Sequence, residues 1–401
     1  MPRRLLPEMT YSITRRCVDR RLFLLPTPEV NEVLLYSLGR ALQNRRVELH
    51  VYSANTNHDH SVMTDRPKGM PEPPGLTEAQ RESADLPGFM GHFRSLTGRA
   101  LNTHYGRGEN FWRVGSYDSC ELWNMQSQID QCLYAWTQVV RDGLVERIED
   151  WPGVVTLPED FGTTIRVAKP KNAFFGGRGK DRVVPTDPYA LAHWTQELAD
   201  AEEAALRLGR ERDKRKKQRK RNKAKPGRGA KRGRALDKAR RRRARKKKLP
   251  APKPKRDRSR LPDFVEIDVV PPPAFQHWPI EKVRTFFREE LDRELERIRA
   301  EREREGKSVM GIEAVMAQNP RDAAGPTWPT FARNPRVCCS KDKELRLRVL
   351  RGLQDWRYRY RIARQALKSG KDVVFPEGTY HLRRFHDVRV RTGSGPPLRA
   401  A

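Results

Sequence analysis

The first 152 residues predict an α+β fold, ferredoxin-like (RRM-like) in outline, with an antiparallel sheet and helices on one face. Segments with alternating apolar residues predict strands, and segments with apolar residues at spacings of three and four predict helices. The expected elements follow the order strand, helix, strand, strand, helix, strand, helix. This order is typical of an antiparallel sheet that packs against helices.

Residues 9–17 alternate well enough for a first strand, with Tyr11 and Ile13 on one side. Residues 27–46 predict a helix, because Pro28 suits a first turn and apolar residues recur along one face. Arginines crowd the strand end and the loop between these elements. Guanidinium groups bind phosphate, so we predict DNA contacts here, although a solvated loop explains the cluster equally well. The arginines are Arg15, Arg16, Arg20 and Arg21.

The central strands carry a pair of histidines. Val47, Leu49 and Val51 alternate with polar residues, residues 54–57 are turn formers, and His58 and His60 stand at the start of the next strand. Residues two apart on a strand share a face, so both imidazoles can bind one divalent ion. A His-x-His pair also occurs by chance on surfaces, so the pair alone is weak evidence for a metal site.

After a loop at 67–87, residues 86–105 predict a second helix and residues 110–117 a short strand or hairpin. In this helix Phe89 and Phe93 are expected to face inward, and Arg94 outward. Residues 120–141 predict a further amphipathic helix with the apolar stripe Leu122, Met125, Ile129, Leu133, Trp136 and Val140. Tyr134 lies off this stripe, where burial does not require an aromatic ring. A half-buried helix tyrosine is nevertheless the commoner role for an isolated tyrosine.

In their order, these segments resemble the REP-associated tyrosine transposases of the insertion-sequence-200-like family. NTNHDHSVMTD resembles the His-hydrophobic-His strand of the family, and LYAWTQVVRDGLVERIEDWP resembles its tyrosine segment. Between them, Asn102 and Trp112 match the asparagine of a helix and the tryptophan of a hairpin. The resemblance covers roughly residues 9–152.

The resemblance implies a DNA transposase that cuts and rejoins single-stranded DNA hairpins in bacteria. Tyr134 would be the nucleophile, leaving a free 3′-hydroxyl and a 5′-phosphotyrosine. His58, His60 and Gln138 would hold a divalent metal, Mg²⁺ or Mn²⁺, and imidazole ligands favour Mn²⁺. A phenol, with a pKa of about 10, is a poor nucleophile at neutral pH unless a metal or a base lowers the cost of its attack. Further predicted DNA contacts are Trp112, Arg113 and Arg141, although hairpin packing explains Trp112 equally well.

Two positions depart from the family pattern. Asp59 replaces the apolar residue between the histidines, and Gln138 replaces the more usual asparagine. A buried unpaired carboxylate is costly, so the face that carries Asp59 is wet, or a nearby arginine pairs with it, or the copy is degenerate. The alternative function is therefore a degenerate, non-cleaving nucleic-acid-binding protein. A relaxase or replication initiator uses the same chemistry, but relaxases generally place the tyrosine before the histidines.

Charge supports a polyanionic partner. The chain of 401 residues has a formal net charge of +31, and phosphate neutralisation makes nucleic acid the first candidate, with a membrane surface as the alternative. No apolar run is long enough to span a bilayer and the N-terminus has no signal-peptide core, so we expect a cytoplasmic, nucleoid-associated protein. The five cysteines form no CxxC pair and are expected to be reduced thiols.

The resemblance and the composition together predict four regions. The resemblance implies that residues 1–152 form the transposase catalytic domain, and residues 153–208 are expected to form a linker and helix. Residues 209–262 are so rich in Lys and Arg that disorder and charge-based DNA binding are expected. Residues 263–401 form a mostly helical accessory domain, with helices near 280–298 and 345–367. The resemblance leaves open whether the protein is a monomer or a homodimer.

Overall fold

The computed structural model describes residues 3–67, 69–72, 83–115, 117–172, 174–175, 261–325, 340–379, 382 and 388–393. The chain divides into two compact units, and residues 1–102, 108–172 and 262–401 make up the larger one. Everything below concerns this larger unit, apart from the last turn of one helix. The helix predicted within 153–208 and nearly all of the predicted basic segment 209–262 lie outside the described residues.

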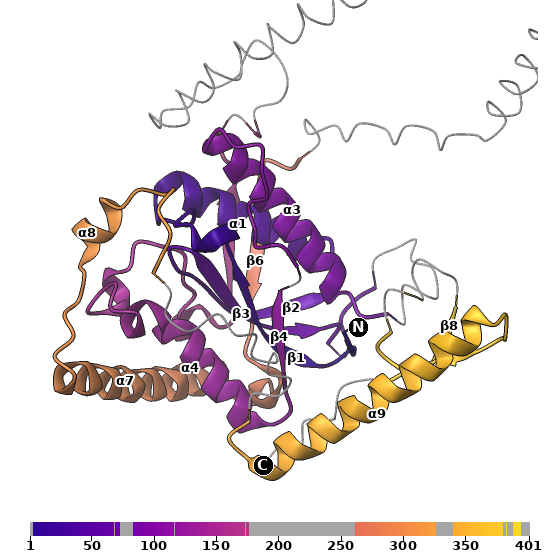
Figure 1. The fold of residues 1–401 in the computed structure, drawn as a ribbon. Coiled ribbons are helices and arrows are strands. Elements are labelled where there is room, and N and C mark those ends of the chain that lie inside the picture. The colour runs from indigo at the N-terminus through magenta and orange to yellow at the C-terminus, as the bar shows by residue number, and fades with distance from the viewer. Residues whose placement is uncertain are drawn as a thin grey trace, which may run out of the picture. The chain divides into compact units, whose positions relative to one another are not determined.

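A six-stranded sheet forms the centre of the larger unit (Figure 1). Its strands lie in the order β4-β1-β3-β2-β6-β5, and the only parallel pair among these described strands is β2 with β6. The bounds are β1 Thr10–Arg16, β2 Val47–Ala54, β3 His58–Asp65, β4 Asp118–Leu122, β5 Thr163–Ala168 and β6 Phe264–Val269. The mixture of a mostly antiparallel sheet with helices confirms the predicted α+β class.

The helices are α1 Pro28–Leu42, α3 Leu86–His104, α4 Met125–Arg141, α7 Ile280–Arg304, α8 Ile312–Met316 and α9 Lys343–Lys368. Single 3-10 turns are η1 Val18–Arg20, η2 Ile148–Asp150, η3 Pro158–Asp160 and η5 Pro273–Phe275, and β7 Val374–Phe375 pairs with β8 Arg389–Val390. The helix predicted from Pro28 is confirmed, and the Thr27 hydroxyl caps it by accepting from the Val30 amide at 3.4 Å. Long helices at 280 and 345 are confirmed as α7 and α9.

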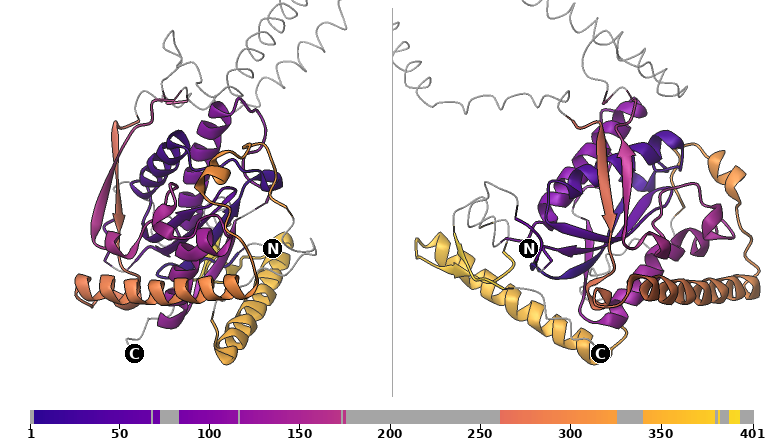
Figure 2. Two further views of the ribbon diagram at one scale, coloured as in Figure 1. Left: turned by 90° about the vertical axis from the view of Figure 1, so that its left-hand side faces the viewer. Right: turned by 180° about the vertical axis from the view of Figure 1, so that it is seen from behind.

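Helices cover both faces of the sheet. Successive residues of a strand point to opposite faces, and on β3 Asp59 contacts Arg94 of α3 while His60 contacts Tyr134 of α4. Helix α1 lies beside α3 in all views (Figures 1 and 2). The expectation of helices on one face therefore holds for α1 and α3 and is wrong for α4.

The face under α4 is polar, whereas the face under α1 and α3 is mainly apolar. The polar residues are Thr10, Thr14, His50, His58, His60 and Thr64, which bond to one another or approach α4. On the opposite face Tyr52 packs edge-to-face against Phe93 at 5.9 Å. A polar sheet face buried beneath a helix is unusual for a core and is suited to a site.

The strand predicted at 110–117 is wrong. In the described part of that segment the pairing is limited to a bridge between Trp112 and Cys17, and the strand β4 begins at Asp118. The predicted helix at 120–141 accordingly begins later, at Met125. Asn124 accounts for the shift, because its side chain accepts from the Ser127 amide while the Ser127 hydroxyl accepts from the Asn124 amide.

The sheet continues across the predicted boundary at residue 152. Strands β5 and β6, on either side of the predicted basic segment, pair with each other, and the Lys169 amide donates to the Asp263 carbonyl at 2.7 Å. Helix α1 packs closely on this pair. Helix α7 packs on α4, where the Phe287 ring meets the Trp136 ring with centroids 5.6 Å apart. Residues beyond 262 therefore contribute to the same core as the first 152 residues.

Two further expectations concern cysteines and membranes. Cys17 and Cys132 are buried free thiols, but Cys120 is in a disulfide, so the expectation of five reduced thiols is wrong at this position. Among the described helices, none combines the length and apolar character that a membrane span requires.

Candidate functional site

The histidine pair lies at the start of β3, between β1 and β2. His58 is paired in register with Arg16 and His60 with Thr14, and the two imidazole rings lie 4.9 Å apart. Only 8% of His58 and 3% of His60 are exposed. The turn before β3 and the two flanking strands therefore hold both rings on the polar face, as the spacing of two predicts.

Hydrogen bonds show which nitrogen of His58 is free. Its Nδ1 lies 2.6 Å from the Asn57 side-chain oxygen, which can only accept, so Nδ1 carries the proton and Nε2 keeps its lone pair. The Nδ1 of His60 lies 2.9 Å from the Thr14 hydroxyl. Its Nε2 is buried and has no hydrogen-bond partner within the described residues. Both rings can therefore present Nε2 to a ligand.

Both histidines are neutral at pH 7. Burial lowers the pKa of His58 to about 3, and the nearby charges of Arg16 and Arg20 act in the same direction. Burial also lowers the pKa of His60 well below its usual value, with His58 and Arg16 adding to the effect. A neutral imidazole is the form that ligates a metal.

Tyr134 stands over the histidine pair. Its ring meets the His60 ring edge-to-face with centroids 5.4 Å apart, and 40% of the residue is exposed. The capped first turn of α4 and the side chain of Gln128 hold the helix in place. Gln128 donates to the Thr10 hydroxyl on β1 at 3.5 Å and accepts from the Ala274 amide at 3.2 Å. The tyrosine off the apolar stripe is thus brought to the histidine pair.

Gln138 follows Tyr134 by one helical turn and is 5% exposed. Its amide nitrogen is buried without a partner in the described part of the chain. Leaving such a group unsatisfied costs roughly 1–3 kcal/mol, and since the two ends of an amide are interchangeable by a flip, the oxygen can occupy this position. Two imidazole nitrogens and an amide oxygen fit Mn²⁺ better than Mg²⁺.

The described ranges contain no cluster of three or more His, Cys, Asp or Glu side chains arranged to hold a metal. Asn55, which the sequence did not single out, lies beside the pair, because its backbone amide donates to the His58 carbonyl at 2.8 Å. The Asn55 side-chain nitrogen donates a hydrogen bond to the Asp142 carboxylate at 2.7 Å. The Asn55 Oδ1 is buried and accepts no hydrogen bond from any described residue. Burial raises the pKa of Asp142, against the Asn55 hydrogen bond and the charge of Arg16.

Asp59, between the two histidines, points to the opposite face and is fully buried. Its carboxylate accepts two hydrogen bonds from Arg94, one of them at 2.6 Å, and a third from the Tyr52 hydroxyl at 3.1 Å. The Arg94 guanidinium lies between the Phe93 and Trp112 rings, 4.5 and 4.6 Å from their centroids. Of the alternatives for Asp59, pairing with an arginine is the one observed. The expectation that Arg94 faces outward is wrong.

Most of the predicted DNA contacts adjoin one another, because the Arg113 amide donates to the Arg16 carbonyl at 3.0 Å and Trp112 is bridged to Cys17. Arg15 donates to the carbonyls of Arg113 and Gly115, and it lines a cavity of about 540 Å³ with Asn102, Trp112 and Arg113. Trp112 is 8% exposed and its indole N–H donates to the Arg94 carbonyl at 3.0 Å, which leaves little of the ring for a base.

The remaining predicted arginines lie nearer the histidines or the tyrosine. Arg16 and Arg20 lie close enough to His58 to lower its pKa, and Arg20 donates to the Gly325 carbonyl at 3.1 Å. Arg21 donates to the Arg321 carbonyl. Arg141 lines the same cavity as Tyr134. The roles of these residues in DNA binding stay predictions.

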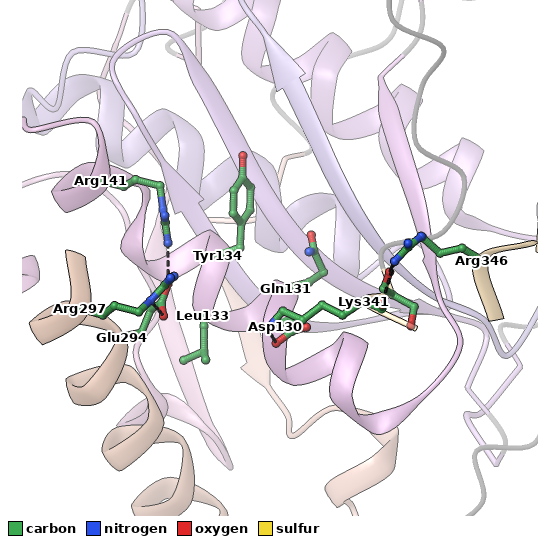
Figure 3. A pocket seen from close by; sticks show the side chains of 10 residues that line it. Asp130, Gln131, Leu133, Tyr134, Arg141, Glu294, Arg297, Lys341 and Arg346 are labelled. Carbon is green, nitrogen blue, oxygen red and sulfur yellow. Dashed lines mark hydrogen bonds and ion pairs between the residues drawn. The ribbon is translucent and has the colours of Figure 1, made fainter. Parts of the chain in front are cut away.

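Tyr134 also lines an open cavity of about 780 Å³ (Figure 3). Arg141 contributes to it from α4, together with residues that are distant in the chain and were not predicted to join this site. These are Glu294 and Arg297 of α7, and Ser340, Lys341 and Arg346.

Similarity to known proteins is limited. No protein-family model matches the chain, and a search of curated proteins finds no match. Among solved structures, the chain is similar to a REP-associated tyrosine transposase bound to a REP hairpin, with 20% identity and a TM-score of 0.32 over 40% of this chain and 84% of that one. It is also similar to a putative transposase from Deinococcus radiodurans R1, with 17% identity and a TM-score of 0.22 over 33% of this chain and 92% of that one.

Proposed function

We propose that this protein is a single-tyrosine DNA transposase that cleaves and rejoins single-stranded DNA hairpins. The observation that carries the proposal is the meeting of Tyr134 and His60, whose rings come from α4 and β3 and lie 5.4 Å apart. The order β4-β1-β3-β2 of the first four strands supports a ferredoxin-like core, as the sequence resemblance implies. A cytoplasmic, nucleoid-associated location and a homodimer are compatible with this function.

The chemistry follows from the groups present. The Tyr134 phenol loses its proton and its oxygen attacks a DNA phosphorus, forming a 5′-phosphotyrosine bond. The bond from phosphorus to the 3′ oxygen breaks, and this oxygen takes up one proton and leaves as a 3′-hydroxyl, so that no net proton is gained or lost. Strand transfer reverses the step, because a 3′-hydroxyl attacks the phosphotyrosine and releases the phenol. His58, His60 and Gln138 would hold a divalent ion, which when bound supplies charge stabilisation to a non-bridging phosphate oxygen.

The second candidate is a non-cleaving DNA-binding protein derived from such a transposase. Its main support was Asp59 between the histidines. The Arg94 pair accommodates this carboxylate on the face away from His58 and His60, so Asp59 is no obstacle to the site. This favours the cleaving function.

The experiment mixes the protein with Mn²⁺ or Mg²⁺ and end-labelled single-stranded hairpins from around its own gene, and resolves products on a denaturing gel. We expect a covalent protein–DNA adduct that is lost in Tyr134→Phe and in His58→Ala. Matched controls are Tyr358→Phe, which alters a tyrosine of α9 that is 56% exposed, and His277→Ala, which alters an exposed histidine. Both controls should keep the adduct.

Two outcomes would contradict the proposal in different ways. If the protein binds the hairpin but forms no adduct with either Mn²⁺ or Mg²⁺, the second candidate, a non-cleaving DNA-binding protein, is favoured. An adduct that survives Tyr134→Phe would exclude Tyr134 as the nucleophile.

A further inference from the structure

The cavity beside Tyr134 has cationic groups on two sides. Figure 3 shows the Tyr134 ring between Arg141 and Arg297 on one side and Lys341 and Arg346 on the other. Its charged lining comprises these four cations and the two carboxylates of Asp130 and Glu294, so the cavity has a net charge of +2. An excess of cations beside an exposed aromatic ring is typical of sites for single-stranded nucleic acid.

On the first side one carboxylate orients two arginines. Glu294 accepts from Arg141 at 2.6 Å and from Arg297 at 2.6 and 2.9 Å. Burial by itself would raise the pKa of Glu294, but these hydrogen bonds outweigh it and lower the pKa. Each guanidinium has five N–H donors in a fixed plane, so both arginines keep donors for a phosphate.

On the second side the cations come from the segment before α9 and from its first turn. The Arg346 guanidinium donates to the Ser340 and Lys341 carbonyls, both at 2.7 Å, so neutral groups orient it, and no carboxylate among the described residues pairs with it. Lys341 bonds Asp130 of α4 at 2.9 Å, but its side chain is 80% exposed, and such exposed pairs are weak. Both cations can therefore turn to a phosphate.

We propose that this cavity binds the phosphodiester backbone of the single DNA strand that flanks the bond cut by Tyr134. The inference rests on the proposed function for the identity of that bond. The exposed ring of Tyr134 provides an apolar surface for a base, and the cations on both sides bind the phosphates.

Size and position favour a strand over a small anion. A volume of about 780 Å³ is at the larger end of cavities of roughly 300–1,000 Å³ that hold drug-sized ligands. The cations flank the nucleophile on both sides, which suits a chain of phosphates crossing the site. The residues Arg297, Lys341 and Arg346 lie beyond residue 152, so the region after the transposase-like segment becomes part of the DNA site.

The test compares the full-length triple variant Arg297→Gln, Lys341→Gln and Arg346→Gln with Arg293→Gln. Arg293 is a matched control, because it lies on the same helix, its side chain is 62% exposed like that of Arg297, and it pairs with a glutamate three residues earlier in the same way. Arg293 does not line the cavity. Affinity for a labelled single-stranded oligonucleotide is measured by fluorescence anisotropy over a series of salt concentrations, and adduct formation is measured in parallel.

We expect the slope of log affinity against log salt to fall by about 2 in the triple variant, since each phosphate contact on a single strand contributes about 0.7. At 0.15 M salt this corresponds to an affinity lower by up to about 50-fold. Arg293→Gln should keep the slope of the unaltered protein. If the triple variant folds poorly, the single variant Arg297→Gln is used instead, and we expect it to lower the slope by about 0.7.

Equal slopes in Arg297→Gln and Arg293→Gln would overturn the inference. The binding result does not depend on cleavage, so the two proposals can fail separately. A reduced slope without any adduct supports the strand site and contradicts the transposase, whereas adduct formation with an unchanged slope does the reverse.

Discussion

The buried pair of Asp59 and Arg94 can be broken from either side or replaced as a unit. Asp59 is fully buried and receives the two Arg94 donors and the Tyr52 hydroxyl. Removing one charge leaves the other buried without a partner, which costs about 3–5 kcal/mol, whereas exchanging both for apolar residues of similar size is often neutral or stabilising. We therefore expect Asp59→Val and Arg94→Met each to lower the free energy of unfolding by about 3–5 kcal/mol.

The double variant Asp59→Val with Arg94→Met should regain most of this loss. Methionine keeps an unbranched stem between the Phe93 and Trp112 rings, and valine restores an apolar residue between the histidines. Urea unfolding gives the coupling energy of the cycle, which should be at least about 3 kcal/mol. In thermal unfolding the single variants should lose roughly 6–20 °C, at 2–4 °C per kcal/mol for a unit of this size.

Single variants that lose less than about 1 kcal/mol, or losses that simply add in the double variant, would refute this reasoning. Adduct formation by the double variant tests whether Asp59 contributes to the site. Because Asp59 points away from the histidine pair, the refolded double variant should keep the activity of the unaltered protein.

Three further predictions concern packing, pH and charge. An added Cβ at Gly39 of α1 would lie 2.7 Å from Val265 on β6, so Gly39→Ala should destabilise by about 1–3 kcal/mol, whereas Gly91→Ala on α3, with nothing within 4 Å, should be neutral or stabilise by up to about 1 kcal/mol in urea unfolding. Equal effects would contradict the packing of α1 on β6. Burial lowers the pKa of His50 to about 4, so its stabilising contribution is complete above about pH 6.5 and is lost as the pH falls towards 4. Between pH 7 and pH 5, the free energy of unfolding measured in urea should fall by about 2 kcal/mol on account of His50. The total fall over this range should be smaller in His50→Gln, and in His277→Asn it should equal that of the unaltered protein. A pH dependence that is the same in all three proteins would exclude His50 as its source. Deleting residues 210–260 should weaken DNA binding and flatten its salt dependence while sparing adduct formation, and an unchanged salt slope would remove this segment from the binding site.

Local patterns were sufficient for part of the fold and the site. The alternation around Val51 predicted a central strand, and Pro28 predicted the start of a helix, because period and capping depend on neighbouring residues alone. The spacing of His58 and His60 placed both rings on one face. The strand predicted at 110–117 failed, since the Asn124 cap decides where α4 begins and leaves Asp118–Leu122 to the sheet.

The sequence by itself determined the α+β class, the apolar stripes of the long helices and the placing of His58 and His60 on one face. Only the tertiary structure decided that Arg94 turns inward to Asp59 and that β5 and β6, which lie on either side of the basic segment in the chain, pair and extend the sheet. It also decided that Arg297 and Arg346 line the same cavity as Tyr134. The reason is physical. Periodicity reports which side of an element is buried, but the burial of a charge depends on a partner that is far away in the chain, and such a partner leaves no mark on the local pattern.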